Sequence, residues 1–194
     1  VTPDALKLLR LNEIKRLRLG HAQRGVALGE LFELDGEPGT DVLAIEGASE
    51  RLQHVGAGMT AGELHVSGDC GAWLGRDMRG GRLLLRGNAG DGVAAGMRGG
   101  LIDITGHAGD FLGAPTPGAV SGMKGGTVVV ARSAGRRLGD RMRRGLVVVG
   151  GDVGSHCGSQ MIAGSIVVLG ASGAGLGVGM RRGTIAPVSY THLT

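Results

Sequence analysis

Apolar positions along this chain recur every 19 residues. The seven methionines (Met59, Met78, Met97, Met123, Met142, Met161 and Met180) are separated by 19, 19, 26, 19, 19 and 19 residues. With each Met counted as position 0, positions +5 and +7 are aliphatic as far as Pro187, and position +15 is Leu, Val or Cys. The alternation of +5 and +7 has the period of two that is typical of a β-strand, so each repeat predicts one short strand.

Glycine marks the corners of the repeat. Position +3 is Gly in every unit, position +12 is Gly in all six complete units, and 41 of the 194 residues are Gly. A 19-residue unit with one short strand cannot bury its apolar face alone, so it must stack on its neighbours. Gly at a corner leaves no side chain where coils approach, or permits a positive φ. We predict an all-β fold, a single-stranded parallel, right-handed β-helix whose methionines form an interior ladder.

The segments that precede and interrupt the repeats predict other elements. Residues 42–47 match residues 63–68 at an offset of 21, which indicates one further coil. Residues 1–41 predict a cap, with a helix over 4–18 and a strand-like segment over 26–34, and this helix would cover the first coil. The seven extra residues of the 26-residue interval predict a protruding loop around 114–121, since that stretch holds two prolines.

Residues 42–186 are thus predicted to form the repeat domain, and residues 187–194 a tail that does not repeat. The composition of the tail differs from everything before it, which favours foreign sequence over a genuine short end. The chain also begins at Val1 rather than Met. We interpret both ends as artificial and the last coil as cut.

Composition narrows the function classes. Aromatic residues make up 2% of the chain and the net charge is only +4, so the stacking platforms of single-strand nucleic-acid binders are missing and no nucleic-acid partner is expected. No apolar run approaches the ~18 residues of a membrane span. Residues 1–10 lack the apolar stretch of a secretory signal, and a cytoplasmic protein is expected. Cys70 and Cys157 lie far apart, which predicts two buried free thiols rather than a metal or redox site.

No catalytic constellation is evident in the sequence, and no catalytic, cofactor-binding or metal-ligating residue is predicted on this chain. The histidines occupy unrelated repeat positions and form no metal-binding pair; they are His21, His54, His65, His107, His156 and His192. Position +10 carries short polar residues that we interpret as turn formers, namely Asp69, Asn88, His107, Ser133 and Asp152.

One polar position stands out because its charge repeats. Position +1 is basic in five repeats, at Arg79, Arg98, Lys124, Arg143 and Arg181, and Thr60 and Ile162 interrupt this basic row. Stacking would place like charges about one strand spacing apart, where they repel by roughly 1 kcal/mol even in water. Two interpretations stay open: a docking site for an acidic partner surface or a polyanionic ligand, or a solvated row balanced by local carboxylates such as Asp77 and Asp140.

The repeat resembles that of a known family. Residues 75–90 (GRDMRGGRLLLRGNAG), 94–109 (AAGMRGGLIDITGHAG) and 139–154 (GDRMRRGLVVVGGDVG) are similar to the GxxMxGGxIxVxGxxG repeat. This repeat occurs in the C subunit of formylmethanofuran dehydrogenase and in the C-terminal β-helix domain of the glutamate synthase large subunit. Residues 28–37 (LGELFELDGE) and the lengthened third interval resemble the formylmethanofuran dehydrogenase C subunit more closely.

The resemblance implies a non-catalytic C subunit of a formylmethanofuran dehydrogenase-like complex. The Arg-rich, Lys-poor composition favours the bacterial formyltransferase/hydrolase branch, which moves formyl groups between tetrahydromethanopterin and a methanofuran-type carrier in one-carbon metabolism. The resemblance places that carrier and the metals (zinc, or molybdenum or tungsten) on partner subunits, and a polyanionic carrier would suit the basic row. A structural domain related to glutamate synthase remains the alternative.

Overall fold

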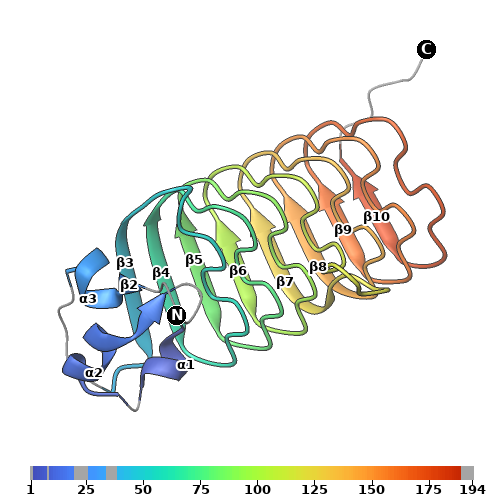
Figure 1. The fold of residues 1–194 in the computed structure, drawn as a ribbon. Helices are drawn as coiled ribbons and strands as arrows, with labels where there is room; N and C mark the ends of the chain where they lie inside the picture. The colour runs from blue at the N-terminus through green and yellow to red at the C-terminus, as the bar shows by residue number, and fades with distance from the viewer. Residues whose placement is uncertain (1, 8, 20–25, 34–38, 189–194) are drawn as a thin grey trace.

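The computed structural model describes residues 2–7, 9–19, 26–33 and 39–188, and Figure 1 shows a row of stacked coils with short helices at its N-terminal end. The helices are α1 (Pro3–Leu6), α2 (Leu11–Arg16) and α3 (Leu28–Leu31), and the short strands β1 (Arg18–Leu19) and β2 (Val26–Ala27) pair antiparallel. The coils contribute β3 (Val42–Ala48), β4 (Glu63–Gly68), β5 (Arg82–Arg86), β6 (Leu101–Ile104), β7 (Lys124–Val130), β8 (Arg144–Val149), β9 (Ser165–Val168) and β10 (Thr184–Pro187).

Strands β3 to β10 form one parallel sheet in sequence order, which confirms the predicted β-helix. Most pairings join equal repeat positions: Leu64 is opposite Leu83, and Ile102 is opposite Val128 across the lengthened interval. The register shifts by one residue near the end of β3 and near the start of β7. The predicted extra coil is present too, because Val42 pairs with Glu63 at the offset of 21. The inserted residues 114–121 contain no strand, and the Met123 N–H donates to the Gly113 carbonyl at 2.7 Å to close the loop at its base.

The methionine ladder lies in the interior, as predicted. Met59, Met78, Met97, Met123, Met142 and Met161 are fully buried, together with the aliphatic side chains at +5 and +7 of the same coils. Met180 is 38% exposed, since no described coil covers the one to which it belongs. Burial of a Met side chain contributes roughly 1.5–3 kcal/mol to stability, so the ladder is a principal part of the core.

The structure explains why Gly always follows Met by three residues. Gly81 has φ +82°, and a Cβ added to it would lie 2.6 Å from Met59 Cε in the preceding coil and 2.7 Å from the Gly62 carbonyl oxygen. Gly126 has the same relation to Met97, with φ +91° and 2.6 Å to Cε. The Met side chain of one coil therefore ends against the Gly of the next. The two positions form one interlocking unit, which the 19-residue period alone did not predict.

The Gly at +12 has another cause, because none of these residues has a positive φ. A Cβ on Gly90 would lie 2.9 Å from the Gly71 carbonyl carbon of the preceding coil, so the backbones approach too closely for a side chain. One residue earlier, at +11, a second line of parallel bridges links the coils from Cys70 to Ala89 and onward to Ser172. These contacts hold the second side of each coil in register.

The predicted helix over residues 4–18 is wrong as a single element. The chain forms α1, turns, and starts α2 at the extended N-cap residue Arg10, whose backbone N–H donates to Glu13 Oε2 at 2.7 Å. Tertiary contacts explain the break. Pro3 is buried, and the ammonium of Lys7 lies 2.7 Å from an Asp41 carboxylate oxygen, so α1 is held against the first coils.

The strand-like segment predicted over 26–34 is also largely wrong. Only Val26 and Ala27 are in β2, and α3 begins at Leu28, which is buried. A Cβ on Gly29 would lie 3.2 Å from Lys15 Cβ, so α3 packs closely on α2. This packing outweighs the local β preference of an apolar run. Leu34 lies outside the described residues, as do residues 189–194 of the predicted tail.

Candidate functional site

The basic row is stacked in register along one corner of the coils. The backbone N–H of each member donates to the carbonyl of the Met in the preceding coil, at 2.8 Å for Arg79, 2.7 Å for Arg98 and Lys124, 2.8 Å for Arg143 and 2.9 Å for Arg181. The four arginines are exposed and Lys124 is partly exposed. The row therefore presents cationic side chains at the corner where each coil enters its strand.

The basic row makes no short ion pairs in the described part of the chain, since none of its five members has a carboxylate oxygen within 4.0 Å. Asp77 pairs instead with Arg76, at 3.2 Å, and Asp140 is buried with no ion pair to a described residue. The solvated row and the docking site both stay open as interpretations.

The first position of the same corner is occupied differently. Thr60 stands at +1 there, and its backbone N–H and hydroxyl both donate to Asp4 Oδ2, at 3.1 Å and 2.6 Å. Burial of Asp4 acts to raise its pKa, but hydrogen bonds from Thr60 and Thr2 hold the pKa below its usual value of 3.8. A carboxylate from α1 thus sits on the +1 corner immediately before the basic row begins.

A line of side-chain acceptors connects the coils at +10. Asp69 Oδ1 accepts from the Asn88 N–H at 2.7 Å, Asn88 Oδ1 from the His107 N–H at 2.9 Å, and His107 Nδ1 from the Ser133 N–H at 3.3 Å. Ser133 and Asp152 continue the line to Ala171. Sequence reasoning predicted turn formers here and missed this role, although every +10 residue from Asp69 to Asp152 carries an acceptor.

A shorter line of the same kind occurs at +13. Asp110 accepts from the Arg136 backbone N–H at 2.7 Å and from its guanidinium at 2.8 and 3.0 Å. These hydrogen bonds lower the pKa of Asp110 and raise that of Arg136. The +10 and +13 carboxylates that form these bonds are engaged in holding coils together, which makes their role structural.

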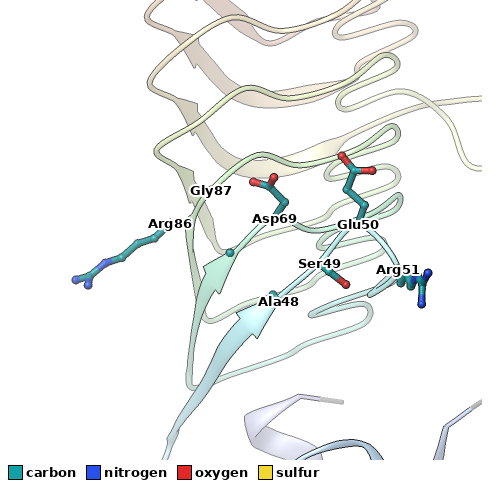
Figure 2. Close-up of a pocket in the computed structure, with 8 residues that line it drawn as sticks. Ala48, Ser49, Glu50, Arg51, Asp69, Arg86 and Gly87 are labelled. Carbon is teal, nitrogen blue, oxygen red and sulfur yellow. The ribbon is translucent and has the colours of Figure 1, made fainter.

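A shallow hollow opens where β3, β4 and β5 end, and Figure 2 shows its lining. Glu50 and Asp69 point in the same direction there, whereas Arg86 projects away from them. Asp69 is already bound to Asn88. The lining is completed by Ala48, Ser49, Arg51, Gly68 and Gly87. These residues bring together no nucleophile, base and orienting group, so the hollow does not have the features of an active site.

The described residues do not fit a metal. No group of three or more His, Cys, Asp or Glu side chains among them is arranged to hold an ion. Cys70 and Cys157 are buried free thiols, as predicted, and burial raises their pKa to about 11 and about 12. A buried thiol with a raised pKa holds little thiolate near neutral pH, which makes it a poor nucleophile. His21 and His192 lie outside the described residues.

The fold and its corners place the chain in a class of proteins, the parallel β-helices built by stacking of one short repeat. The chain belongs to the family described as "GXGXG motif", whose sequence profile matches residues 51–190. In the described part of the chain, no helix has the length and apolar character to cross a membrane.

Characterised relatives narrow the comparison. The C subunit of the formyltransferase/hydrolase complex Fhc of Methylorubrum extorquens is 45% identical over 74 residues, which cover 38% of this chain and 28% of the relative. The C subunit of the molybdenum-containing formylmethanofuran dehydrogenase 1 of Methanothermobacter thermautotrophicus is 37% identical over 76 residues, or 39% of this chain and 19% of the relative. The aligned stretches thus span less than a third of these curated relatives.

A solved structure matches over much more of the fold. It is a chain in the crystal structure of the formyltransferase/hydrolase complex FhcABCD from Methylorubrum extorquens, in complex with methylofuran. The TM-score is 0.87 at 44% identity, covering 95% of this chain and 69% of that one. The resemblance predicted from the repeat is confirmed.

Proposed function

We propose that this chain is a non-catalytic C subunit of a formyltransferase/hydrolase complex of the formylmethanofuran dehydrogenase type. The complex would handle formyl transfer between tetrahydromethanopterin and a methanofuran-type carrier in one-carbon metabolism. The observation that carries this proposal is the match to a chain of the FhcABCD structure at 44% identity over 95% of this chain. The curated relatives described above are themselves C subunits, which favours this role over a domain of glutamate synthase.

The carrier and the metals are assigned in this proposal to partner subunits. FhcABCD was solved with methylofuran, and the relative from Methanothermobacter thermautotrophicus is a subunit of a molybdenum-containing enzyme. The buried free thiols are compatible with a reducing compartment, so the complex is proposed to be cytoplasmic.

The basic row is proposed to bind carboxylates, either on an acidic partner surface or on a polyanionic carrier. This role is supported by the exposure of the four arginines of the row, and no member of the row has an ion-pair partner within 4.0 Å among the described residues. Replacing Arg79, Arg98 and Arg143 with Gln should weaken assembly or carrier binding and reduce its salt dependence, because the attraction between exposed charges is screened by salt. Unchanged assembly and unchanged carrier affinity at low salt, where the attraction is least screened, would exclude this role.

The function is tested by purifying the tagged chain from its own organism and identifying the proteins that co-elute. We expect the other subunits of a formyltransferase/hydrolase complex, and formyl transfer activity in the assembly. The chain expressed alone should show no formyl transfer or oxidation. Activity of the isolated chain would contradict a non-catalytic role, and co-elution with a glutaminase-bearing enzyme would favour the glutamate synthase alternative.

A further inference from the structure

The outward face of the sheet changes character along the stack. Side chains at +4 and +6 alternate with the buried ones and point away from the core. On β7, β8 and β9 these outward positions include a contiguous group of apolar residues, all partly exposed: Val129, Leu146, Val148 and Val167. Leu169, immediately after β9, extends the group and is 49% exposed. We name these five residues the outer apolar patch.

The corresponding positions on β4 to β6 carry more polar residues and no contiguous apolar group of this size. β4 presents Glu63 and His65, whose side chains approach to 3.1 Å, β5 presents Arg82, and β6 presents Leu101 and Asp103. Val42 of β3 is apolar and 49% exposed, but it stands beside Glu63. Leu84 is apolar at +6 of β5, but in the sheet it stands between His65 and Asp103. Equal positions of one repeat thus carry different chemistry in the two halves of the sheet.

Apolar side chains that stay in contact with water on the outer face of a sheet favour burial against another surface. Figure 1 shows that the three helices gather at the β3 end, away from β7 to β9. The outer apolar patch is therefore not covered by them. The interior of the coils does not require these residues either, since +5 and +7 already fill it.

The margin of the patch at the start of β8 is positively charged, whereas Asp103 of β6 borders Val129 on another side. Arg143 of the basic row directly precedes β8, and Arg144 at the start of β8 is exposed as well. Three strands about 4.8 Å apart give an apolar centre only about 14 Å wide, so a stable interface must extend to this rim. An apolar centre with a charged rim is the usual anatomy of a protein interface.

We propose that the outer apolar patch is the binding face for another subunit of the complex, one that presents an apolar surface bordered by carboxylates. The basic row supplies the charge complement to that border. Asp4 shows that a carboxylate can bind at this corner. It lies on α1, which packs on the first coils, and it accepts two hydrogen bonds from Thr60 at the +1 position. A second copy of this chain fits less well, since it carries the same net charge of +4. The inference rests on the proposed function.

The test compares two substitutions at the same repeat position in the tagged, full-length chain expressed in its own organism. Val148→Glu places a charge in the patch, and Leu84→Glu is the matched control on the polar half. We expect Val148→Glu to reduce the recovered formyltransferase/hydrolase subunits at least about tenfold, as the loss of an interface hot spot does. Leu84→Glu should leave recovery near the wild-type level. Arg143→Glu should reduce recovery by a smaller factor and weaken its salt dependence.

Two further measurements separate the outcomes. Circular dichroism and sedimentation of each isolated variant establish that it is folded and report its oligomeric state. If the Val148→Glu variant recovers the other subunits at the wild-type level, or if both substitutions reduce recovery equally, the proposed binding face is wrong. The proposed function would still stand in either case. A wild-type dimer that Val148→Glu dissociates would show that a second copy covers the patch, which also overturns it. If the wild-type chain recovers no such subunits, the proposed function fails first and the inference fails with it.

Discussion

Strands β4 and β8 have the same interior and different exteriors. Leu64 and Val66 of β4 are at most 1% exposed. Val147 and Val149, at the same repeat positions (+5 and +7) in β8, are completely buried. Both pairs pack in the core that runs through the coils. The two pairs differ in volume by a single methylene group, that of Leu64 compared with Val147.

The outward residues of the same strands share no such likeness. β4 presents Glu63 beside His65, and β8 presents Leu146 beside Val148. The interior repeats because each coil must fit the next one, whereas the exterior has no such partner within the stack. The repeated residues therefore specify the stacking of the coils. The outward residues that depart from the repeat point to the surfaces that bind other molecules.

The largest expected effect comes from charging the two sides of one strand. Val147→Glu would bury a carboxylate in the core, where an unpaired charge costs more than the stability of most domains can offset. We expect this variant to be unfolded or insoluble. Val148→Glu, one residue away and outward, should change the unfolding free energy of the isolated chain by less than about 1 kcal/mol. Denaturant melts followed by circular dichroism compare the two, and equal losses would contradict the assignment of inner and outer faces.

The loss of stability on truncating a methionine of the ladder should depend on the position of its coil in the stack. Met123→Ala removes a fully buried side chain between coils, and we expect a loss of about 2–5 kcal/mol. Met180→Ala, at the 38% exposed end of the ladder, should cost less than about 1.5 kcal/mol. Unfolding free energies from urea titration measure the difference. Similar losses would mean that the last described coil is covered in solution.

The steric part of the requirement for Gly at +3 can be separated from the backbone part with two glycines of nearly equal φ. A Cβ on Gly81 (φ +82°) would meet Met59 Cε and the Gly62 carbonyl oxygen, whereas Gly118 (φ +83°) has nothing within 4 Å of an added Cβ. Gly118→Ala therefore bears only the cost of the left-handed backbone, about 1–2 kcal/mol. Gly81→Ala should lose about 1–3 kcal/mol more from overpacking. Thermal melts of the two variants measure this excess, and its absence would show that the positive φ alone demands Gly at +3.

The smallest effect concerns the cap, which joins the repeat through Asp4. Because its pKa is lowered in the folded state, Asp4 stabilises the cap fully above its usual pKa of 3.8, and this contribution is lost as pH falls through the lowered value. Asp4→Asn should thus melt below the wild type at about pH 6, and the difference should shrink as the pH falls below 3.8. A constant difference at every pH would indicate that the carboxylate charge plays no part.

The repeat made most of the fold predictable, and the cap shows where prediction stopped. Strand positions, coil register and the burial of Cys157 all follow from a 19-residue period, since one stacking rule applies to every coil. The cap contains no repeated pattern from which its elements could be predicted. Its helix was predicted as one element but breaks near Arg10, because contacts of Pro3 and Lys7 with distant residues decide its course.

The candidate surfaces were predicted unevenly for a similar reason. The basic row is visible in the sequence because the charge recurs at +1, and the structure brings its members into one line. The acceptor line at +10 was not predicted, because Asp, Asn, His and Ser are chemically different side chains even though each can accept a hydrogen bond. The outer apolar patch escaped as well, because apolar residues at +4 and +6 are scattered through only part of the repeats.

The order of residues alone is enough to specify the periodic interior, since side chains that recur every 19 residues can be buried together only if the coils stack in register. Contacts in three dimensions were needed to establish which corner residues touch across coils, where the cap docks, and which apolar residues face away from the core. Those outcomes depend on distances between residues far apart in the chain, such as Asp4 and Thr60, and no local pattern encodes such a distance.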